Sequence, residues 1–530
     1  MTDAVGAGDR RGQRAALRVA LGIFSSRIAG LIRQRVFAHY FGLTAPADAF
    51  TAASRIPNFL NNLFGEGALS GSFIPVYASL LARGERELAD RVAGAVAALL
   101  ALIVSVVVVV GIAITPWILP LIAPGFAGPT RELAIRLVRI LFPAVGLTVM
   151  SAWCLGVLNS HRRFFLSYAV AVIWNGAMIA TMLLFGEGSA LPLLAERLAW
   201  GSVAGSALMV AAQLPIVVRV APNLRFALDA GSEQVRTVAR NFVPVFMSRG
   251  VVQLSGYIDT LLATLVSTGA TTAIANAQTL YLLPVSLFGM SVSAAELPAM
   301  SGIAHEDQSG VEQLRRRLDE GLRQIAFFIV PSAAAFLALG DVIAAALFQT
   351  GRFSHDDAVY VWGILAGSAV GLLASTLGRL YSSAYYALRD TRRPLNFAII
   401  RVVLTTVLGY LFAIPLPRWL GMAPAWGAAG LTASAGIAGW VEMLLLRQSL
   451  NSRIGRTGLP VSYVITLWAS ALAGVAAAWA VKLTFFPPHP ILAAILILGP
   501  YGLVFLSATF ALGVPEARNA LGMLRRRRLP

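Results

Sequence analysis

Long, nearly uncharged apolar runs recur along the whole of this 530-residue chain, and they constrain its fold more than any other feature. Each run has about 18 or more residues, which is enough for an α-helix to cross the ~30 Å hydrocarbon core of a bilayer. Hydrophobic residues make up 57% of the chain and charged residues only 13%. A soluble domain usually has about twice that charged share. The sequence therefore predicts an all-α integral membrane protein.

Charge clusters and Pro/Gly turns divide the chain into about fourteen candidate membrane helices. Their predicted ranges are 17–41, 46–80, 92–115, 132–158, 164–185, 191–218, 241–266, 271–303, 324–339, 357–388, 394–413, 424–446, 461–485 and 490–513. The second, eighth and tenth ranges are longer than a bilayer requires, so we expect these helices to tilt, bend or protrude. The ninth helix could begin before residue 324.

A polar, basic segment separates the first six predicted helices from the last eight. The predicted organisation is an N-lobe of six helices at 1–218, a cytoplasmic linker at 219–240, a C-lobe of six helices at 241–450, two further helices at 461–513 and a basic cytoplasmic tail at 514–530. Transporters built from two repeated halves often bind substrate between them. The similarity between the halves is too faint to identify a repeat from the residues.

Arginines are distributed very unequally between alternate connections of the predicted helices. One set of connections, which includes both termini, holds twenty-eight arginines, whereas the opposite set holds only Arg131, Arg352 and Arg418. The positive-inside rule places the richer set, and hence both termini, in the cytoplasm. The net charge of +17 comes from these short clusters and not from a continuous basic domain, so nucleic acid is not an expected partner.

Ionisable residues inside the predicted spans are the most informative about function, because each costs ~2.5–3.5 kcal/mol at the bilayer centre. The first two spans hold most of them, namely Arg27, Arg33, Arg35, Asp48, Arg55 and Glu66. Arg27 lies about half-way along its span, too deep to reach the headgroups easily. One interpretation is an arginine-lined cavity for a phosphate group, which a guanidinium can bind through two hydrogen bonds. The alternative is structural pairing with Asp48 and Glu66, or contact with the outer headgroups.

The second span carries residues that a purely structural helix would not usually need. Pro57 removes a backbone hydrogen bond in mid-helix, and Asn58 and Asn61 supply amides on the following turn. Irregular backbone at this depth is tolerated where it lines protein or a wet cavity. Asn58 and Asn61 are therefore candidate substrate contacts. Glu66 is a proton carrier, a salt-bridge partner or a packing residue.

Later spans contain a few more charges. Arg249 and Asp259 share the seventh span but are too far apart along one regular helix to pair directly. Arg379 lies a few turns inside the tenth span and is the better pathway candidate. Glu296 and Glu442 lie near cytoplasmic ends, where we expect them to be solvated or to pair at a gate.

No enzyme active site or metal site is expected. The five histidines lie far apart, at span ends or in loops, without metal-ligand spacing, and no phosphate-loop pattern is present. The one cysteine, Cys154, lies in an apolar span, which excludes an intramolecular disulfide. We therefore predict a transporter with no catalytic residues and no resident cofactor. Because no ATP-binding motif exists, the membrane potential or an ion gradient is the expected energy source.

Five segments carry a resemblance to a known family. They are SSRIAGLIRQRVFAHYFG (25–42), DAFTAASRIPNFLNNLFGEGALSGSFIPVY (48–77), PWILPLIAPGF (116–126), GVLNSHRRFFLSYA (156–169) and YYALRDTRRPLNFAI (385–399). In their order and spacing, these segments resemble the MurJ or MviN family of lipid II flippases, part of the MOP transporter superfamily. The resemblance extends over nearly the whole chain.

The resemblance implies two six-helix lobes around a central V-shaped cavity, with a lipid-facing groove formed by the last two of fourteen helices. It implies alternating access that moves the undecaprenyl-pyrophosphate-linked headgroup of lipid II, a peptidoglycan precursor, from the cytoplasmic to the periplasmic leaflet of the bacterial inner membrane. The expected partners are lipid II, membrane lipids and other cell-wall synthesis proteins. Some members of the family have a sodium site, so sodium is a candidate coupling ion.

Matched position by position, Arg27 and Arg33 correspond to cavity arginines of the family's first helix. Asn61 and Thr279 stand where the family commonly has two further arginines. Arg55 and Arg249 are candidates to restore that missing charge from nearby turns. The predicted substrate-binding residues are Arg27, Arg33, Arg55, Asn58, Asn61, Arg249 and Thr279, and the predicted gating or ion-pairing residues are Asp48, Glu66 and Arg379.

Three functions stay open at this point. The first is lipid II flipping, and the second is export of another polyprenyl-linked glycan or of a drug. The third is a membrane scaffold without transport activity, which the two missing arginines favour. A drug pump for cationic compounds fits poorly with a first helix that itself carries arginines.

Overall fold

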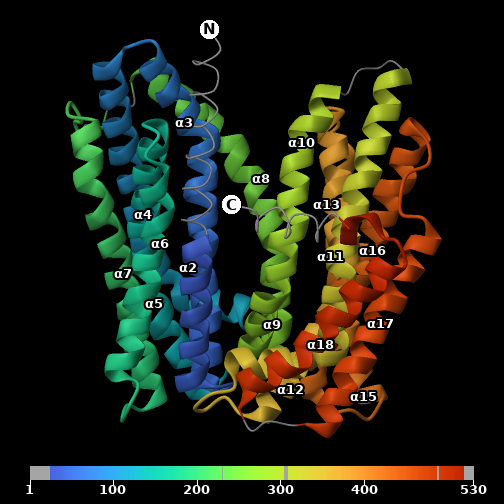
Figure 1. Ribbon diagram of the computed structural model, residues 1–530. Coiled ribbons are helices and arrows are strands. Elements are labelled where there is room, and N and C mark those ends of the chain that lie inside the picture. Colours follow the sequence, from blue (N-terminus) through green and yellow to red (C-terminus); the bar gives the residue numbers. More distant parts are fainter. Residues whose placement is uncertain (1–23, 229–230, 304–307, 486–488, 519–530) are drawn as a thin grey trace, which may run out of the picture. The chain divides into compact units, whose positions relative to one another are not determined.

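The computed structural model describes residues 24–228, 231–303, 308–485 and 489–518 (Figure 1). Within these ranges the chain is almost entirely α-helical and contains no β-strand; a single β-bridge joins Thr350 to Phe353. Helices satisfy every backbone polar group within one segment, which is what a chain in a bilayer requires. The predicted all-α class is confirmed.

Nine helical segments of the described ranges are long and apolar enough to cross a membrane. They are Arg86–Ile122, Gly128–Ser160, Leu191–Val220, Ala270–Ile303, Ser309–Phe348, Arg392–Trp419, Pro424–Ile454, Val461–Thr484 and Pro490–Ala511. Helices α12 (His355–Ala369) and α13 (Leu372–Ala387), bent by 42°, give a tenth if they form one span. The other four expected spans are helical too, but their described portions are shorter, broken or more charged. The count of fourteen therefore stays a prediction.

The chain forms two compact units, of which the first is Met1–Leu265. Its helices are residues 24–41, α2 (Ala45–Phe64), α3 (Glu66–Ala82), α4 (Arg86–Ile122), α5 (Gly128–Ser160), α6 (Phe164–Phe185), α7 (Leu191–Val220) and nearly all of α8 (Glu233–Val266). Helix α5 packs against α2, α3, α4 and α7 (Figure 1). The fully buried Trp153 of α5 donates its indole N–H to the carbonyl of Ala93 in α4 at 3.1 Å. This helix is the centre of the first core.

The second unit is Val266–Pro530. It contains α9 (Ala270–Pro284), the π-helical turn η1 (Val285–Met290), α10 (Ser291–Ile303), α11 (Gln308–Phe348), α12, α13, α14 (Arg392–Ala413), α15 (Pro415–Trp419), η2 (Pro424–Trp426), α16 (Gly427–Ile454), α17 (Val461–Thr484) and α18 (Pro490–Ala511). Helix α11 packs against α12, α13, α17 and α18, and α16 packs against α12, α13 and α14. An apolar cluster around Leu339, Ala478 and Ile497 joins α11 to α17 and α18.

Two of the overlong predicted helices are interrupted at glycines. A Cβ atom on Gly65, between α2 and α3, would lie 2.2 Å from the carbonyl oxygen of Asn61, so only glycine fits this break. A Cβ on Gly371, between α12 and α13, would lie 2.3 Å from the Cα of Gly436 in α16. Both breaks agree with the expectation that these long ranges bend. At both breaks, another part of the backbone lies too close for a side chain to fit, so each position requires glycine.

The two units repeat an unusual loop geometry. Arg162, after α5, and Arg389, after α13, have φ values of 59° and 57°, which non-glycine residues rarely adopt. Gly42 and Gly269, which precede α2 and α9, also have positive φ. These glycines are the same number of residues apart as the two arginines. The spacing between these positive-φ positions is therefore the same in the two units.

Several helices extend beyond their predicted ends. Helix α8 begins at Glu233, so the last part of the predicted linker at 219–240 is helical. Helices α4, α5 and α11 also begin before their apolar runs. Apolar length marks where a helix crosses the bilayer, whereas backbone hydrogen bonding continues into the polar residues outside it. The predicted division into lobes at 1–218 and 241–450 stays a prediction.

Candidate functional site

Arg33 is the predicted site residue whose surroundings the structure defines best. It lies on the helix of residues 24–41 and is half-buried. Its Nε donates a hydrogen bond of 2.9 Å to the side-chain oxygen of Asn175 in α6. Its guanidinium carbon lies 5.2 Å from the centre of the Trp174 ring, within cation–π range. Two neighbouring residues of α6 thus hold the guanidinium in place, one through a hydrogen bond and one through its ring.

The two partners of Arg33 are themselves held in place. The side-chain amide of Asn175 donates to the carbonyl of Ala171 at 2.8 Å, which aims its oxygen at Arg33. The indole N–H of Trp174 donates to the hydroxyl of Ser202 in α7 at 3.2 Å. Neither Asn175 nor Trp174 was predicted as a site residue. Both lie in an uninterrupted apolar helix. The single asparagine of this helix was the only feature of its sequence that could have indicated a site.

The charge of Arg33 is not cancelled by these contacts. Asn175 and Trp174 are neutral, and in the described part of the chain Arg33 forms no ion pair. A guanidinium has five N–H groups, of which the bond to Asn175 uses one. A positioned, unneutralised arginine is suited to bind an anion such as a phosphate.

The other charged residues of the first two spans have different environments. Arg27 is exposed on the same helix as Arg33. Asp48 lies in the first turn of α2 and is only 2% exposed, with its own interactions inside the fold. A buried, engaged carboxylate agrees better with a structural role for Asp48 than with a solvated gate residue.

Arg55 of α2 lies beside α8. Asp259 and Tyr257 of α8 are close enough to interact electrostatically with the Arg55 guanidinium. The hydroxyl of Tyr257 also lies 3.4 Å from the backbone oxygen of Arg55, and its ring meets Phe59 edge-on at 4.9 Å. Asp259 therefore neighbours Arg55, whereas sequence spacing only showed that it does not pair with Arg249. Tyr257 was missed because its partner lies on another helix.

Four predicted site residues of this unit remain, namely Asn58, Asn61, Glu66 and Arg249. Asn58 is exposed on α2. Asn61 is half-buried, and its backbone carbonyl accepts from the N–H of Gly65 at 2.7 Å at the end of α2. The side chains of Glu66 and Arg249 lie outside the described part of the structure.

In the second unit the predicted residues are less closely associated. The hydroxyl of Thr279 donates to the carbonyl of Ala275 at 2.9 Å, so it bonds to its own helix. Arg379 is exposed on α13. Arg401 of α14 forms an ion pair of 3.1 Å with Glu442 of α16. Glu442, which we expected to be solvated or part of a gate, thus has a partner within this unit.

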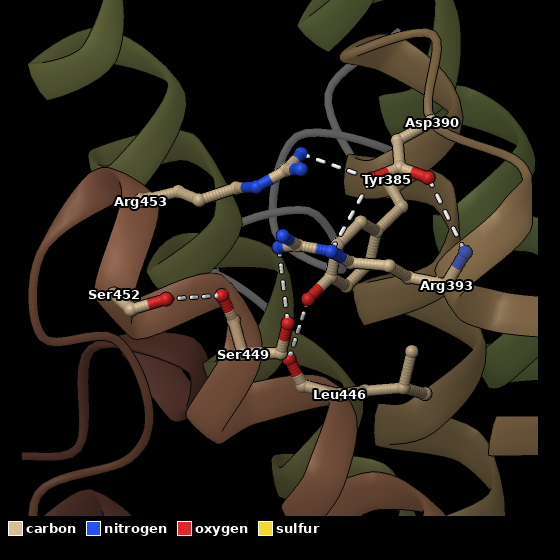
Figure 2. A network of polar contacts seen from close by, with 7 residues as sticks. All are labelled: Tyr385, Asp390, Arg393, Leu446, Ser449, Ser452 and Arg453. Atoms are coloured by element: carbon tan, nitrogen blue, oxygen red, sulfur yellow. Dashed lines mark hydrogen bonds and ion pairs between the residues drawn. The ribbon is translucent and has the colours of Figure 1, made fainter. Parts of the chain in front are cut away.

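The YYALRDTRRPLNFAI segment forms a polar junction between helices (Figure 2). Asp390 follows α13 and lies 3.0 Å from the guanidinium of Arg453 in α16 and 3.7 Å from that of Arg393 in α14. Arg393 also donates to the hydroxyl of Ser449 at 3.2 Å, and Tyr385 donates to the carbonyl of Leu446 at 3.2 Å. These residues tie the turn between α13 and α14 to α16.

The GVLNSHRRFFLSYA segment makes a polar contact with α3 in the first unit. His161, which caps α5, lies with its Nε2 2.9 Å from the hydroxyl of the buried Tyr77 in α3. Burial lowers the pKa of His161, and the positive charges of Arg86 and Arg163 lower it further, while Asp90 acts in the opposite direction. Burial and the two neighbouring arginines therefore favour the neutral form of the imidazole.

Among the described residues, no group of three or more His, Cys, Asp or Glu side chains could hold a metal ion. Cys154 is a free, buried thiol. The structure brings together two groups of side chains. Arg33, which forms no ion pair in the described part of the chain, lies beside Asn175 and Trp174. Arg55 lies beside Asp259 and Tyr257.

Known proteins resemble this chain over most of its length. The family model for the lipid II flippase MurJ matches residues 37–497. The lipid II flippase MurJ of Burkholderia cenocepacia is 32% identical over 83% of this chain and 84% of that protein. A probable lipid II flippase MurJ of Vibrio cholerae is 28% identical over 80% of each chain.

Two solved structures have the same fold. A lipid II flippase MurJ in an inward closed conformation gives a TM-score of 0.76 at 24% identity, over 93% of this chain and 98% of that one. An inward-facing multidrug resistance MATE family transporter of the MOP superfamily gives 0.66 at 17% identity, over 83% and 98%. The family model, the relatives and the shared fold agree, and the chain belongs to the MurJ family of lipid II flippases.

Proposed function

We propose that this chain flips lipid II. In this proposal it carries the undecaprenyl-pyrophosphate-linked headgroup from the cytoplasmic to the periplasmic leaflet of the bacterial inner membrane by alternating access. The observation that carries the proposal is Arg33, a positively charged side chain that neutral partners hold in place in a member of the MurJ family.

The neutral partners matter for the chemistry. Removing a charge from water costs several kcal/mol, so a structural arginine is normally found with a carboxylate. Arg401 and Glu442 in the second unit are such a pair. Arg33 is instead oriented by an amide oxygen and an aromatic ring, which leave its charge available. A pyrophosphate carries the opposite charge and can accept several guanidinium N–H groups.

Arg27 would add a second positive charge on the same helix, on a more exposed turn. Six residues separate it from Arg33, so the two side chains leave a regular helix in directions that differ by ~120°. They would therefore contact different parts of a headgroup. Arg55, beside Asp259, is better suited to an ion pair between α2 and α8 than to substrate binding.

One observation favours a second candidate function. Asn61 and Thr279 stand at positions where the family commonly has arginines, and the Thr279 hydroxyl bonds to its own helix. A site with fewer positive charges fits a polyprenyl-linked glycan that carries less negative charge than lipid II. Such a glycan is the alternative substrate that an experiment must distinguish from lipid II.

The arginine distribution supports an orientation with both termini in the cytoplasm. The sequence has no ATP-binding motif, so we propose the membrane potential or an ion gradient as the driving force, with sodium as one candidate ion. Membrane lipids and other cell-wall synthesis proteins are its proposed partners.

Complementation of a bacterium depleted of its own lipid II flippase tests the proposal. We expect the unmodified chain to restore growth and the appearance of lipid II on the periplasmic side. Arg33→Ala should abolish both at normal membrane levels, and Arg33→Lys should restore only part, because lysine cannot reproduce the guanidinium geometry. Arg136→Ala is the control, since Arg136 is an exposed arginine already paired with Glu196.

Two results would contradict the proposal. If the unmodified chain reaches the membrane in full amount but leaves lipid II on the cytoplasmic side, it acts on another glycan or is a scaffold. If Arg33→Ala flips lipid II as well as the unmodified chain, Arg33 is not a substrate-binding residue.

A further inference from the structure

A cavity of about 280 Å³ lies within the second unit, between α11, α13, α16 and the first turns of α17. Its lining is mainly apolar and includes Leu373, Leu377, Trp440, Met443 and Val464. It receives no residue from α18, which distinguishes it from a groove formed by the last two helices. The cavity thus belongs to the junction where α17 joins the rest of this unit.

One side of the cavity is open to the surroundings of the protein. Val461 and Ile465, on the first turns of α17, line the cavity and are 75% and 62% exposed. Large aliphatic side chains exposed on a membrane helix face lipid and not water. An acyl chain could therefore enter the cavity sideways from the bilayer.

Arg447 supplies the charged group of the lining. Its Nε donates to the carbonyl of Thr457 at 3.0 Å. The guanidinium lies against Gly458, where an added Cβ would come within 2.8 Å of its nearest nitrogen. Gly458 has φ of 125°, so both its conformation and its missing side chain allow Arg447 to lie flat at this place. The Arg447 side chain therefore forms part of the cavity wall.

The surroundings of Arg447 contain two further arginines and the carboxylate of Asp319. Asp319 of α11 accepts a hydrogen bond of 2.9 Å from the N–H of Gly458. Arg315, Arg323 and Arg447 all lie within electrostatic range of this one carboxylate. In the ranges that the structure describes, none of these three arginines forms an ion pair.

This cluster differs from the neighbouring arginine cluster of Figure 2. There, Arg393 and Arg453 share the carboxylate of Asp390 at 3.7 Å and 3.0 Å. Beside the cavity, three guanidinium groups lie within electrostatic range of Asp319, and none of them forms an ion pair with it in the described ranges. An amphiphilic anion requires an apolar cavity that is open toward lipid and a positive charge that no carboxylate pairs with. This site combines the two.

We propose that this cavity binds an anionic glycerophospholipid of the cytoplasmic leaflet, with an acyl chain against Leu377 and Val464 and the phosphate on Arg447. The proposal rests on the orientation given above, because the rim belongs to the arginine-rich, cytoplasmic set of connections. Anionic headgroups are common in that leaflet, and basic pockets between helices on that side bind them. A bound lipid would fill the junction between α16 and α17 and so support the position of α17.

Fluorescence quenching by brominated lipids tests this proposal, because Trp440 lines the cavity. The full chain in mixed micelles would be titrated with dibrominated phosphatidylglycerol or dibrominated phosphatidylcholine. The chain has ten tryptophans, so the signal of Trp440 is the difference between the unmodified chain and Trp440→Phe. We expect this difference signal to be quenched at lower phosphatidylglycerol than phosphatidylcholine concentration.

Arg447→Gln should raise the half-quenching concentration of phosphatidylglycerol about tenfold, the value expected for loss of a charge-assisted hydrogen bond, and leave phosphatidylcholine unchanged. Arg392→Gln is the matched control, since Arg392 is an exposed arginine of the same set of connections that does not line the cavity. Val464→Phe, which narrows the cavity without removing charge, should weaken quenching by both lipids. This second variant keeps the test decisive if Arg447→Gln folds poorly.

Equal quenching by the two lipids, unchanged by Arg447→Gln, would mean nonspecific contact with surrounding lipid and would overturn the proposal. Absence of any quenching of the Trp440 signal would overturn it as well, since the cavity would then be closed to lipid. Neither result bears on lipid II flipping, because the proposed phosphate-binding residue, Arg33, belongs to the first unit.

Discussion

Arg33 and Asn175 are joined by a hydrogen bond of 2.9 Å between the guanidinium Nε and the side-chain oxygen. The two residues belong to different helices of the first unit, so α6 sets the direction in which the arginine of the first helix points. Because Asn175 is neutral, the bond orients the guanidinium without cancelling its charge. Asn175 is therefore a positioning residue for the proposed phosphate site.

Replacing Asn175 tests this relationship. Asn175→Leu should lower lipid II flipping about tenfold or more, because a hydrogen bond to a charged group is worth about 1.5–3 kcal/mol. Asn175→Asp keeps the acceptor but adds a negative charge, so we expect it to lower flipping too. The measurement is the rate at which lipid II becomes accessible in the outer leaflet. Asn396→Leu, at an exposed asparagine of α14, is the control. Full activity of Asn175→Asp would contradict the inference that the partner of Arg33 must be neutral.

The ion pair between Lys482 of α17 and Asp341 of α11 should behave as a buried pair. The two charged atoms are 2.5 Å apart, and their side chains are only 16% and 10% exposed. Lys482→Met should destabilise the protein by about 3–5 kcal/mol because it leaves a buried carboxylate without its partner. The double variant Lys482→Met, Asp341→Leu should recover most of that loss in denaturant unfolding. A double variant as unstable as the single one would show that the pair is not the cause.

The cluster around Asp390 should contribute much less. Its arginine partners, Arg393 and Arg453, have side chains that are 40% and 37% exposed, so solvent screens both ion pairs. We expect Asp390→Asn to lower the free energy of unfolding by about 0.5–1 kcal/mol. In a double-mutant cycle with Arg453→Gln, the coupling energy should be of similar size. Glu320→Gln, at an exposed acid of α11, is the control. If Asp390→Asn lowers the free energy of unfolding by several kcal/mol, the cluster around Asp390 is effectively buried.

Stability should decrease in mild acid through His161. Its pKa in the folded protein lies below the ordinary value of 6.5, chiefly because of burial. As the pH falls through about 6.5, the unfolded state takes up the proton first, so the free energy of unfolding decreases until the folded pKa is passed. The thermal midpoint of the purified protein, measured between pH 8 and pH 5, should fall less in His161→Gln than in the unmodified chain. Equal pH dependence of the two proteins would contradict this assignment.

Cysteine labelling should establish the orientation of the chain. In a Cys154→Ala background, Glu85→Cys probes the connection after α3 and Glu187→Cys probes the connection before α7; both glutamates are exposed. A maleimide that cannot cross the membrane should label Glu187→Cys in intact spheroplasts, and Glu85→Cys only after the membrane is opened. The reverse pattern would contradict the proposed orientation and, with it, the leaflet assigned to the lipid cavity.

The sequence by itself determined the class of this protein and the approximate positions of its helices. Apolar length is a local property, and it is sufficient because a bilayer requires a minimum span. The lengths of the second and tenth ranges also predicted that these helices would tilt, bend or protrude, and the structure breaks them at Gly65 and Gly371. Resemblance over five segments identified the family, and it directed attention to Arg33.

Only the tertiary structure decided which side chains meet. Asn175 beside Arg33, Tyr257 beside Arg55 and the uncompensated charge of Arg447 all depend on which faces of the helices are packed together. In a soluble helix, the apolar stripe would reveal that face. Lipid tails and protein interior are equally apolar, so a membrane helix is hydrophobic on both its packed and its lipid-facing side. Its sequence therefore shows that it crosses the membrane but not which neighbour it faces.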